Sequence, residues 1–190
     1  MKLFKKLVGD NIYLSPNTAD EEIIEKFTEW LNDFEVTDYT GRSAQVVTLE
    51  GERKWFENYP TDNNQTFFIV RKEDDKVIGN IGLHRIDKMN RTATLGIFIG
   101  DKSERNKGYG TETVRLILDY GFNYLNLNSI KLDVMEFNER AITCYKKCGF
   151  KEYGRRRKCY FLNGKYYDKV EMDILPEEFK EEYIRNKNIK

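Results

Sequence analysis

The feature that most constrains the fold is a glycine-containing loop, ERNKGYGTET at residues 104–113, between an apolar strand-like run and an apolar helix-like run. Gly108 and Gly110 let the backbone approach a ligand closely, because neither carries a Cβ atom. The free N–H groups at a helix start carry about half a positive charge and favour phosphate oxygens. Arg105 and Lys107 add mobile positive charge. The loop therefore predicts either a plain helix start or a cradle for a phosphorylated ligand.

Two common phosphate-binding loops do not match these residues. A Walker A loop requires Gly-Lys followed by Ser or Thr, which this loop lacks. A dinucleotide fingerprint requires a third glycine, and this chain has Thr113 at that position. The strands upstream also look antiparallel, whereas the fingerprint opens a βαβ unit. Neither of these two loop types is therefore expected here.

The composition fits one globular chain with a sizeable core. The 190 residues are 39% hydrophobic and 14% aromatic, and 32 basic residues balance 32 acidic ones. Zero net charge removes the long-range field that nonspecific nucleic-acid binders usually carry. The basic run Arg155–Lys158 stands beside aromatic residues, so an RNA or ribosome partner stays as an alternative to a solvated edge.

The cysteines and the N-terminal residues indicate a soluble cytoplasmic protein. Cys144, Cys148 and Cys159 are too few, and odd in number, for a disulfide framework. Cys144 and Cys148 share a helical face, but further soft ligands at suitable spacing are missing, so packed thiols are expected and no metal. The chain shows no signal peptide and no apolar run long enough to span a membrane.

The hydrophobic periodicity predicts one mixed α/β domain with a largely antiparallel sheet of about seven strands. Strands are expected at 11–16, in a hairpin within 65–87, at 90–101, at 129–136, and in a hairpin around Asn163-Gly164 within 159–175. Helices are expected at 18–34, 48–59, 114–127 and 138–150, with a charged terminal helix over 176–188. Residues 35–47 are expected to form an exposed loop, and Gly96 to mark a bulge.

These motifs together resemble the GNAT N-acetyltransferases. The pattern Arg105-x-x-Gly108-x-Gly110 is similar to the acyl-CoA pyrophosphate loop of that family, and a second motif follows at Asn138-x-x-Ala141-x-x-x-Tyr145-x-x-x-Gly149-Phe150. The resemblance covers about residues 76–175 and is greatest to the branch with ribosomal-protein N-terminal acetyltransferases and spermidine acetyltransferases. It implies a single GNAT-like domain over 1–190, with acceptor-side helices within 18–59. It also implies acetyl-CoA as the acyl donor and an amine as the acceptor.

The resemblance also assigns the residues that hold acetyl-CoA. The strand before the loop pairs through its backbone with the pantetheine arm, and a backbone N–H there faces the oxyanion. Asn138 caps its helix and also reaches the pantetheine chain. The expected cofactor-binding residues are Ile97, Phe98, Ile99, Arg105, Asn106, Lys107, Gly108, Tyr109, Gly110, Thr111 and Asn138.

Tyr145 is the expected general acid. It lies one helical turn after Ala141, on the face expected to meet the sheet, where it would equally suit a core aromatic. The family pattern places this tyrosine near the cofactor sulfur. A thiol with a pKa of about 8.5 and a phenol with a pKa of about 10 are close enough for proton transfer in a confined site.

The general base is left open. An amine with a pKa of about 10 is about one part in a thousand neutral at pH 7, so some group must accept its proton. Relatives often carry a glutamate where this chain has Thr94, and this departure keeps a catalytically silent acyl-CoA-binding module as an alternative. Other positions considered are Glu35, Asp38, Glu136 and His84, of which Glu35 and Asp38 lie where the family forms its acceptor site. A homodimer through the closing hairpin is also considered.

Overall fold

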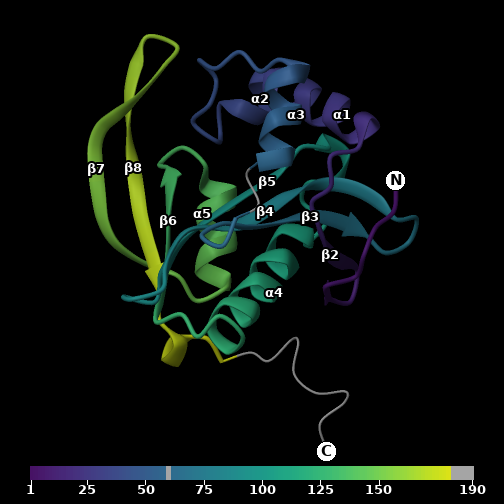
Figure 1. Ribbon diagram of the computed structural model, residues 1–190. Coiled ribbons are helices and arrows are strands. Elements are labelled where there is room, and N and C mark those ends of the chain that lie inside the picture. Colours follow the sequence, from purple (N-terminus) through teal and green to yellow (C-terminus); the bar gives the residue numbers. More distant parts are fainter. Residues whose placement is uncertain (59–60, 181–190) are drawn as a thin grey trace, which may run out of the picture.

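The structure, a computed structural model, describes residues 1–58 and 61–180. These residues form an eight-stranded sheet with helices on both faces (Figure 1). The strands are β1 (Leu7–Val8), β2 (Ile12–Pro16), β3 (Gln65–Arg71), β4 (Lys76–Asp87), β5 (Thr92–Ile99), β6 (Ser129–Met135), β7 (Lys151–Leu162) and β8 (Lys165–Ile174). The helices are α1 (Glu21–Asn32), α2 (Phe34–Thr37), α3 (Leu49–Asn58), α4 (Tyr109–Asn123) and α5 (Glu139–Lys147), with 3₁₀ turns η1 (Lys102–Glu104) and η2 (Pro176–Glu178).

The alternation of apolar side chains along β3 explains why both faces of the sheet are covered. Phe68 and Val70 point to one face, where they pack with Phe27 of α1 and Phe56 of α3. Their neighbour Phe67 points to the other face, toward the core that α4 and α5 cover. Successive strand residues point to opposite faces, so one apolar strand builds two cores. Figure 1 shows α1, α2 and α3 together, with the β7–β8 hairpin standing at the end of the sheet.

The pairing of β5 with β6 sets the position of the functional site. The sheet order is β1-β2-β3-β4-β5-β6-β8-β7, and β5–β6 is its parallel pair. β4 accompanies β5 from Thr92 to Ile99, whereas β6 pairs with β5 from Thr92 to Thr94. After Thr94 the two central strands diverge, and one edge of β5 loses its neighbour. The splayed strand expected before the loop is therefore present.

Several expectations about the elements need correction. The sheet has one strand more than expected, because β1 has two residues and is too short to show an alternating pattern. Residues 34–37 form α2 rather than loop, with the Asp33 carboxylate accepting the Glu35 N–H at 2.9 Å. The charged terminal helix does not begin at Pro176: residues 176–178 form a 3₁₀ turn, and its later residues, from 181 on, lie outside the described part.

Gly96 does not form the expected bulge. It pairs in register with Gly82, and the irregularity in the β4–β5 ladder falls between His84 and Asp87. A Cβ atom at Gly96 would lie 3.0 Å from Nε2 of His84. The missing side chain therefore makes room for the imidazole ring of the neighbouring strand.

Candidate active site

The loop before α4 has the geometry of an anion cradle. Gly108 is the N-cap residue of α4, with a φ of +87° in the left-handed region that favours glycine. Since glycine has no side chain, no side chain caps the N–H groups of the first turn. The N–H groups of Tyr109, Gly110 and Thr111 belong to the first turn of α4 and therefore have no acceptor within the helix. A Cβ atom on Gly110 would meet Ile99 Cδ1 at 3.7 Å and Cys144 Sγ at 3.9 Å, which is ordinary contact.

Arg105 joins this loop to both neighbouring elements. Its Nε donates to the Ile99 carbonyl at 3.2 Å, and its Nη1 donates to the Glu35 carbonyl at 3.3 Å. Burial and the charge of Arg140 lower the pKa of Arg105 from its ordinary value. Two cationic groups therefore meet at this end of the site, which favours an anionic ligand.

Two residues expected at the cradle have their side chains elsewhere. Lys107 Nζ pairs with the buried Glu104 carboxylate at 3.0 Å, and Tyr109 packs against the core beneath the sheet. Asn106, Gly108, Gly110 and Thr111 do line the cavity described next. Lys107 and Tyr109 therefore offer the cradle their backbone rather than their side chains.

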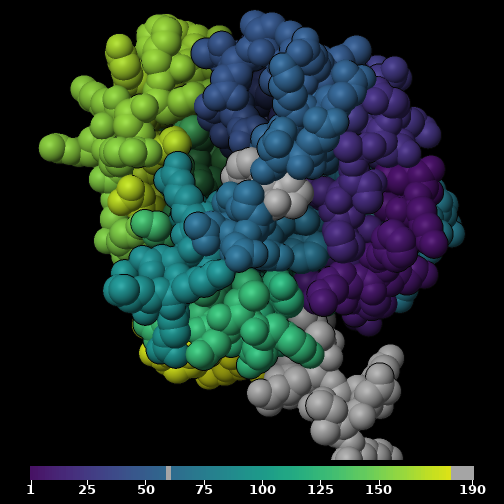
Figure 2. All heavy atoms as spheres, in the orientation of Figure 1, coloured from purple at the N-terminus to yellow at the C-terminus, as the bar shows by residue number. Residues whose placement is uncertain are grey.

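A cavity of about 930 Å³ begins at the cradle and passes between β5 and β6. Its walls include Leu95, Ile97 and Ile99, which face α4 and α5, and also Gly96 and Phe98, which face α1 and α3. Side chains of both faces can line one cavity because the strands have diverged after Thr94. Figure 2 shows the molecule hollowed between the yellow-green hairpin and the blue segment around α2 and α3.

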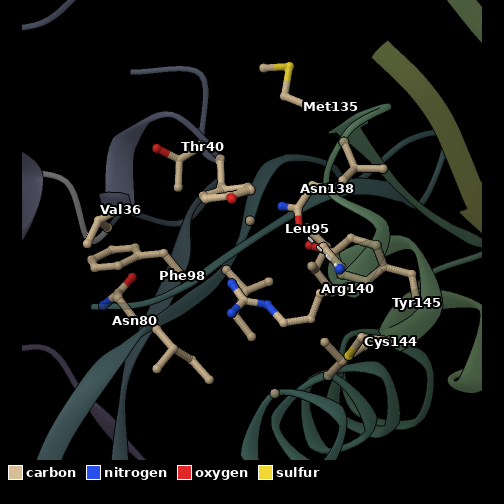
Figure 3. A pocket seen from close by; sticks show the side chains of 18 of the residues that line it. Val36, Thr40, Asn80, Leu95, Phe98, Met135, Asn138, Arg140, Cys144 and Tyr145 are labelled. Atoms are coloured by element: carbon tan, nitrogen blue, oxygen red, sulfur yellow. Dashed lines mark hydrogen bonds between the residues drawn. The ribbon is translucent and has the colours of Figure 1, made fainter. Parts of the chain in front are cut away.

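Asn138, Tyr145 and Cys144 reach the cavity from α5 (Figure 3). The Asn138 side chain accepts the Ala141 N–H at 3.2 Å, so it caps α5 as expected. Tyr145 is 8% exposed. Burial raises the pKa of Tyr145 above its ordinary value of 10.0, and the charges of Cys144, Cys148 and Asp133 raise it further. The phenol therefore stays protonated, and able to donate, throughout the physiological range.

Cys144 of α5, which the sequence had suggested as a packed thiol, lines the cavity beside the cradle. Its Sγ lies 3.3 Å from Thr111 Oγ1. A hydrogen bond with Cys148 lowers the pKa of Cys144 to about 7, against the opposing effect of burial, with the Thr111 hydrogen bond and the charges of Lys147 and Arg115 assisting. Within residues 1–58 and 61–180, no group of three or more His, Cys, Asp and Glu side chains is arranged to hold a metal ion.

The far end of the cavity lies against α1 and α3 and contains a carboxylate that the sequence had not indicated. Glu52 of α3 is 6% exposed and lines the cavity together with His84 and Thr94. Burial raises the pKa of Glu52, and the charge of Arg42 partly opposes this rise. The sequence did hold a signal, because Glu52 precedes Trp55 and Phe56 by three and four residues and so shares their helical face.

His84, which was predicted to bind the acceptor, lines the same end of the cavity. Burial lowers the pKa of His84 from 6.5 to about 4, and the charges of Arg42 and Arg85 lower it further. The ring is therefore neutral near pH 7 and too weakly basic to take a proton from an alkylammonium group.

The depressed pKa of His84 predicts a specific loss of stability in acid. Below pH 6.5 His84 becomes protonated in the unfolded chain, whereas in the folded chain it becomes protonated only at about pH 4, its pKa there. His84 therefore stabilises the fold fully above pH 6.5, and this share is lost as pH falls to about 4. The half-buried ring makes the loss on the order of 2 kcal/mol rather than the full shift.

Urea unfolding of the wild type and of His84→Gln across this pH window measures the effect. The free energy of unfolding should fall more steeply in the wild type, by the amount just given. A difference between the two proteins that stays constant across the window would show that His84 does not titrate in this way.

The other positions considered for acceptor binding or for the base lie away from the cavity end. The Glu35 carboxylate pairs with Lys102 at 2.7 Å on the exposed side of α2. Asp38 accepts the Ser43 hydroxyl at 2.6 Å, and Glu136 accepts the Asp168 N–H at 2.9 Å. Their roles in acceptor binding or proton transfer remain predictions. The sequence also missed three arginines that line the cavity: Arg42, Arg85 and Arg140.

A loop suited to an anion, a splayed strand and a cavity that passes through the sheet are typical of a group transferase with two substrates, one of them phosphorylated. The sequence model of the acetyltransferase (GNAT) domain matches residues 12–151. The chain therefore belongs to the GNAT acetyltransferase family, as the motifs suggested, and it is an N-acetyltransferase that uses acetyl-CoA.

Similar proteins have been named across this family. A probable N-acetyltransferase, YjcK of Bacillus subtilis, is 34% identical over 176 residues, which is 89% of this chain and 96% of the relative. A spermidine N(1)-acetyltransferase of Vibrio cholerae is 34% identical over 118 residues, 62% of this chain and 68% of the relative. The crystal structure of a Vibrio cholerae spermidine N-acetyltransferase with CoA and spermine has a TM-score of 0.79 at 24% identity, covering 88% of this chain and 97% of that chain.

The structural similarity confirms the expected α/β fold with helices on both sides of a mixed sheet. Among the described helices, none is long and apolar enough to cross a bilayer.

Proposed function

We propose that the chain transfers an acetyl group directly from acetyl-CoA to a primary amine, with both substrates bound at once. The observation that carries this proposal is the cavity through the sheet, because it extends from the cradle on the α4 side to a far end beside α1 and α3. The amine nitrogen attacks the thioester carbonyl, so that a C–N bond forms and the C–S bond breaks. The nitrogen loses a proton, and the thiolate gains one.

The donor side of the site is suited to coenzyme A. The N–H groups that open α4 face the position of the pyrophosphate, and Arg105 stands beside them. The free edge of β5 offers the backbone groups of Ile97 and Ile99 to the amides of the pantetheine arm. The backbone groups of Phe98 point to β4 instead, because Gly100 N–H donates to the Ile78 carbonyl and Phe98 pairs with Asn80 in the same register. Free N–H groups on the same edge would stabilise the oxyanion of the tetrahedral intermediate.

Tyr145 would donate a proton or a hydrogen bond to the departing thiolate. It lines the cavity on α5, and no hydrogen bond to another described residue involves its hydroxyl. Its raised pKa makes it a weak acid, so hydrogen bonding to the developing thiolate carries much of its effect.

Glu52 would accept the proton of the amine, directly or through water. A buried carboxylate with a raised pKa is a better base than an exposed one, and the Glu52 carboxylate forms no hydrogen bond or ion pair with another described side chain. It would supply the carboxylate that relatives often place at the position of Thr94.

Glu52→Gln should lower kcat/KM for the amine by roughly 100-fold. The amide keeps the shape of the side chain but cannot accept a proton, and it relieves the burial of a charge, so the protein should stay folded. The measurement is the release of free thiol from acetyl-CoA across a pH series, with the acidic limb of the profile altered in the variant.

Two further proteins sharpen this test. Glu50→Gln changes an exposed carboxylate of the same helix, paired with Lys54, and should leave kcat/KM unchanged. Thr94→Glu in the Glu52→Gln background places a carboxylate on the neighbouring cavity wall and should restore part of the rate. Unchanged turnover in Glu52→Gln would show that Glu52 is not the general base.

Thiol titration with a panel of amines tests the transfer itself. The panel contains peptides with free N-termini, polyamines and amino acids, each mixed with acetyl-CoA and purified protein. Release above the hydrolysis background is expected for at least one class. Calorimetric binding of CoA with no turnover across the panel would instead support the silent acyl-CoA-binding module.

The cellular setting is part of the same proposal. Free thiols at Cys144, Cys148 and Cys159 suit the reducing cytoplasm. The net charge of zero argues against nucleic acid as the main partner. A homodimer formed through the closing hairpin is also proposed, since β7 is an edge strand.

A further inference from the structure

Two arginines at the acceptor end of the cavity form no ion pair within the described part of the chain. Arg42, from the segment after α2, and Arg85, near the end of β4, both line the cavity. Neither guanidinium forms a hydrogen bond or an ion pair with any described residue. Two other cations of the cavity are engaged: Lys169 pairs with Asp133 at 2.7 Å, and Arg140 lies 5.9 Å from the Tyr39 ring centroid.

The backbone at Arg85 is held in an unusual conformation. Its φ is +53°, in the left-handed region, at the irregularity between His84 and Asp87 in the β4–β5 ladder. Its N–H donates to Asn64 Oδ1 at 3.1 Å, which holds the turn. A bulge of this kind redirects a side chain, and a non-glycine residue is strained in this conformation. The chain thus keeps a strained position that brings a guanidinium group to the cavity.

The charge balance at this end is positive. The charges of Lys169 and Asp133 cancel in their ion pair, so two guanidinium groups without an ion pair stand against one carboxylate, Glu52, on which the charge of Arg42 acts. All three of Arg42, Arg85 and His84 line the cavity, and the charge of each arginine lowers the pKa of His84. An acceptor with additional positive charges would be repelled here, whereas an acceptor with an anion would be attracted.

We propose that Arg42 and Arg85 bind a carboxylate of the acceptor, so that the substrate is an amine that also carries a carboxylate. This inference rests on the proposed acetyl transfer and names the acceptor class. The planar guanidinium group suits a carboxylate, because it can form two parallel hydrogen bonds with it. Glu52 then faces the amine and the arginines face the acid, so the acceptor is held at both ends. A polyamine, such as the acceptors of the spermidine acetyltransferases named above, fits this end poorly.

The test compares amino carboxylates with their amides. Each unbranched ω-amino carboxylate, in a series of increasing chain length, is assayed beside the corresponding amide, with kcat/KM corrected for the fraction of neutral amine. Spermidine and phosphoethanolamine complete the panel. For the chain length that fits, the kcat/KM of the amino carboxylate should exceed that of its amide by at least about 10-fold, as expected for a charge-assisted hydrogen bond. The ratio of the two kcat/KM values should fall close to one in the double variant Arg42→Gln/Arg85→Gln.

Lys88→Gln is the matched control, because it removes an exposed positive charge just after β4, where Lys88 pairs with Asp62 at 3.4 Å. It should keep the full preference for the acid. A preference for spermidine or for the amides that is the same in all proteins would overturn the carboxylate site. A preference for phosphoethanolamine over every carboxylate would overturn the choice of anion.

A binding measurement separates this inference from the proposed transfer. Calorimetry of the amino carboxylate with CoA-loaded protein reports the anion site without any chemistry. Binding in the wild type that is lost in the double variant supports the site even if no acetyl group is transferred. Turnover of spermidine together with no detectable binding of any amino carboxylate would overturn the site and leave the transferase role intact.

Discussion

Replacing Gly110 with tryptophan is expected to abolish acetyl-CoA binding while the protein stays folded. The glycine opens α4 at the cradle, and its missing side chain points into the cavity between Ile99 and Cys144. An indole there would occupy the space that the pyrophosphate and the start of the pantetheine arm require. The affinity for acetyl-CoA should fall by at least about 100-fold, which corresponds to about 2.7 kcal/mol.

Gly110→Ala is the control for this substitution. A Cβ atom at Gly110 would make ordinary contacts of 3.7 and 3.9 Å, so alanine should bind the cofactor with little change. Calorimetric titration with acetyl-CoA, beside a thermal unfolding curve for each protein, measures both effects. Near-normal binding by a folded tryptophan variant would show that the cofactor does not use this loop.

The second large effect is expected for Tyr145→Phe. Removal of the hydroxyl should lower kcat by roughly 100-fold, since the thiolate then departs without a donor. The ring still packs beside Phe150, at 5.7 Å between centroids, so the fold and the binding of acetyl-CoA should be kept. Pre-steady-state acetyl transfer and equilibrium binding of acetyl-CoA give the two quantities separately.

The pH profile distinguishes a donor from a titrating base. Because the pKa of Tyr145 lies above its ordinary value, the hydroxyl stays protonated where the enzyme is assayed. The Phe variant should therefore lower the whole profile without moving its inflections. Tyr120→Phe, a half-buried phenol on α4 outside the cavity lining, should leave kcat unchanged. Equal turnover in the wild type and Tyr145→Phe would exclude Tyr145 as the acid.

Local signals were sufficient for most of the fold. Ile23, Ile24, Phe27 and Leu31 repeat at helical spacing and are the buried residues of α1. Asn163-Gly164 marks the turn between β7 and β8, with positive φ at both residues. Such signals depend on neighbours in the chain, and these neighbours agree with the tertiary structure. The loop at 104–113 was placed correctly after a strand, but α4 begins at Tyr109 rather than at 114, so the last five residues of that stretch are helical.

The features that failed depend on distant parts of the chain. The end of β5–β6 pairing at Thr94 involves strands far apart in sequence, so the gap could be expected from the family but not from its own residues. Glu52 was missed because a glutamate on an amphipathic helix usually faces solvent. Arg85 was missed because its position depends on an irregularity in the β4–β5 ladder and on a hydrogen bond to the distant Asn64, and its own neighbours in the chain indicate neither.

The gap between β5 and β6 links the stability of the fold to the proposed binding of the cofactor. The residues of β5 after Thr94 have backbone groups on one edge that β6 does not pair. In the proposed complex the pantetheine arm takes the place of the missing strand. A ligand that binds only the folded chain adds to its stability, by about 2.7 kcal/mol when it is present at a hundredfold excess over its Kd. The concentration of acetyl-CoA in the cell would then set how long the enzyme survives as well as how fast it works.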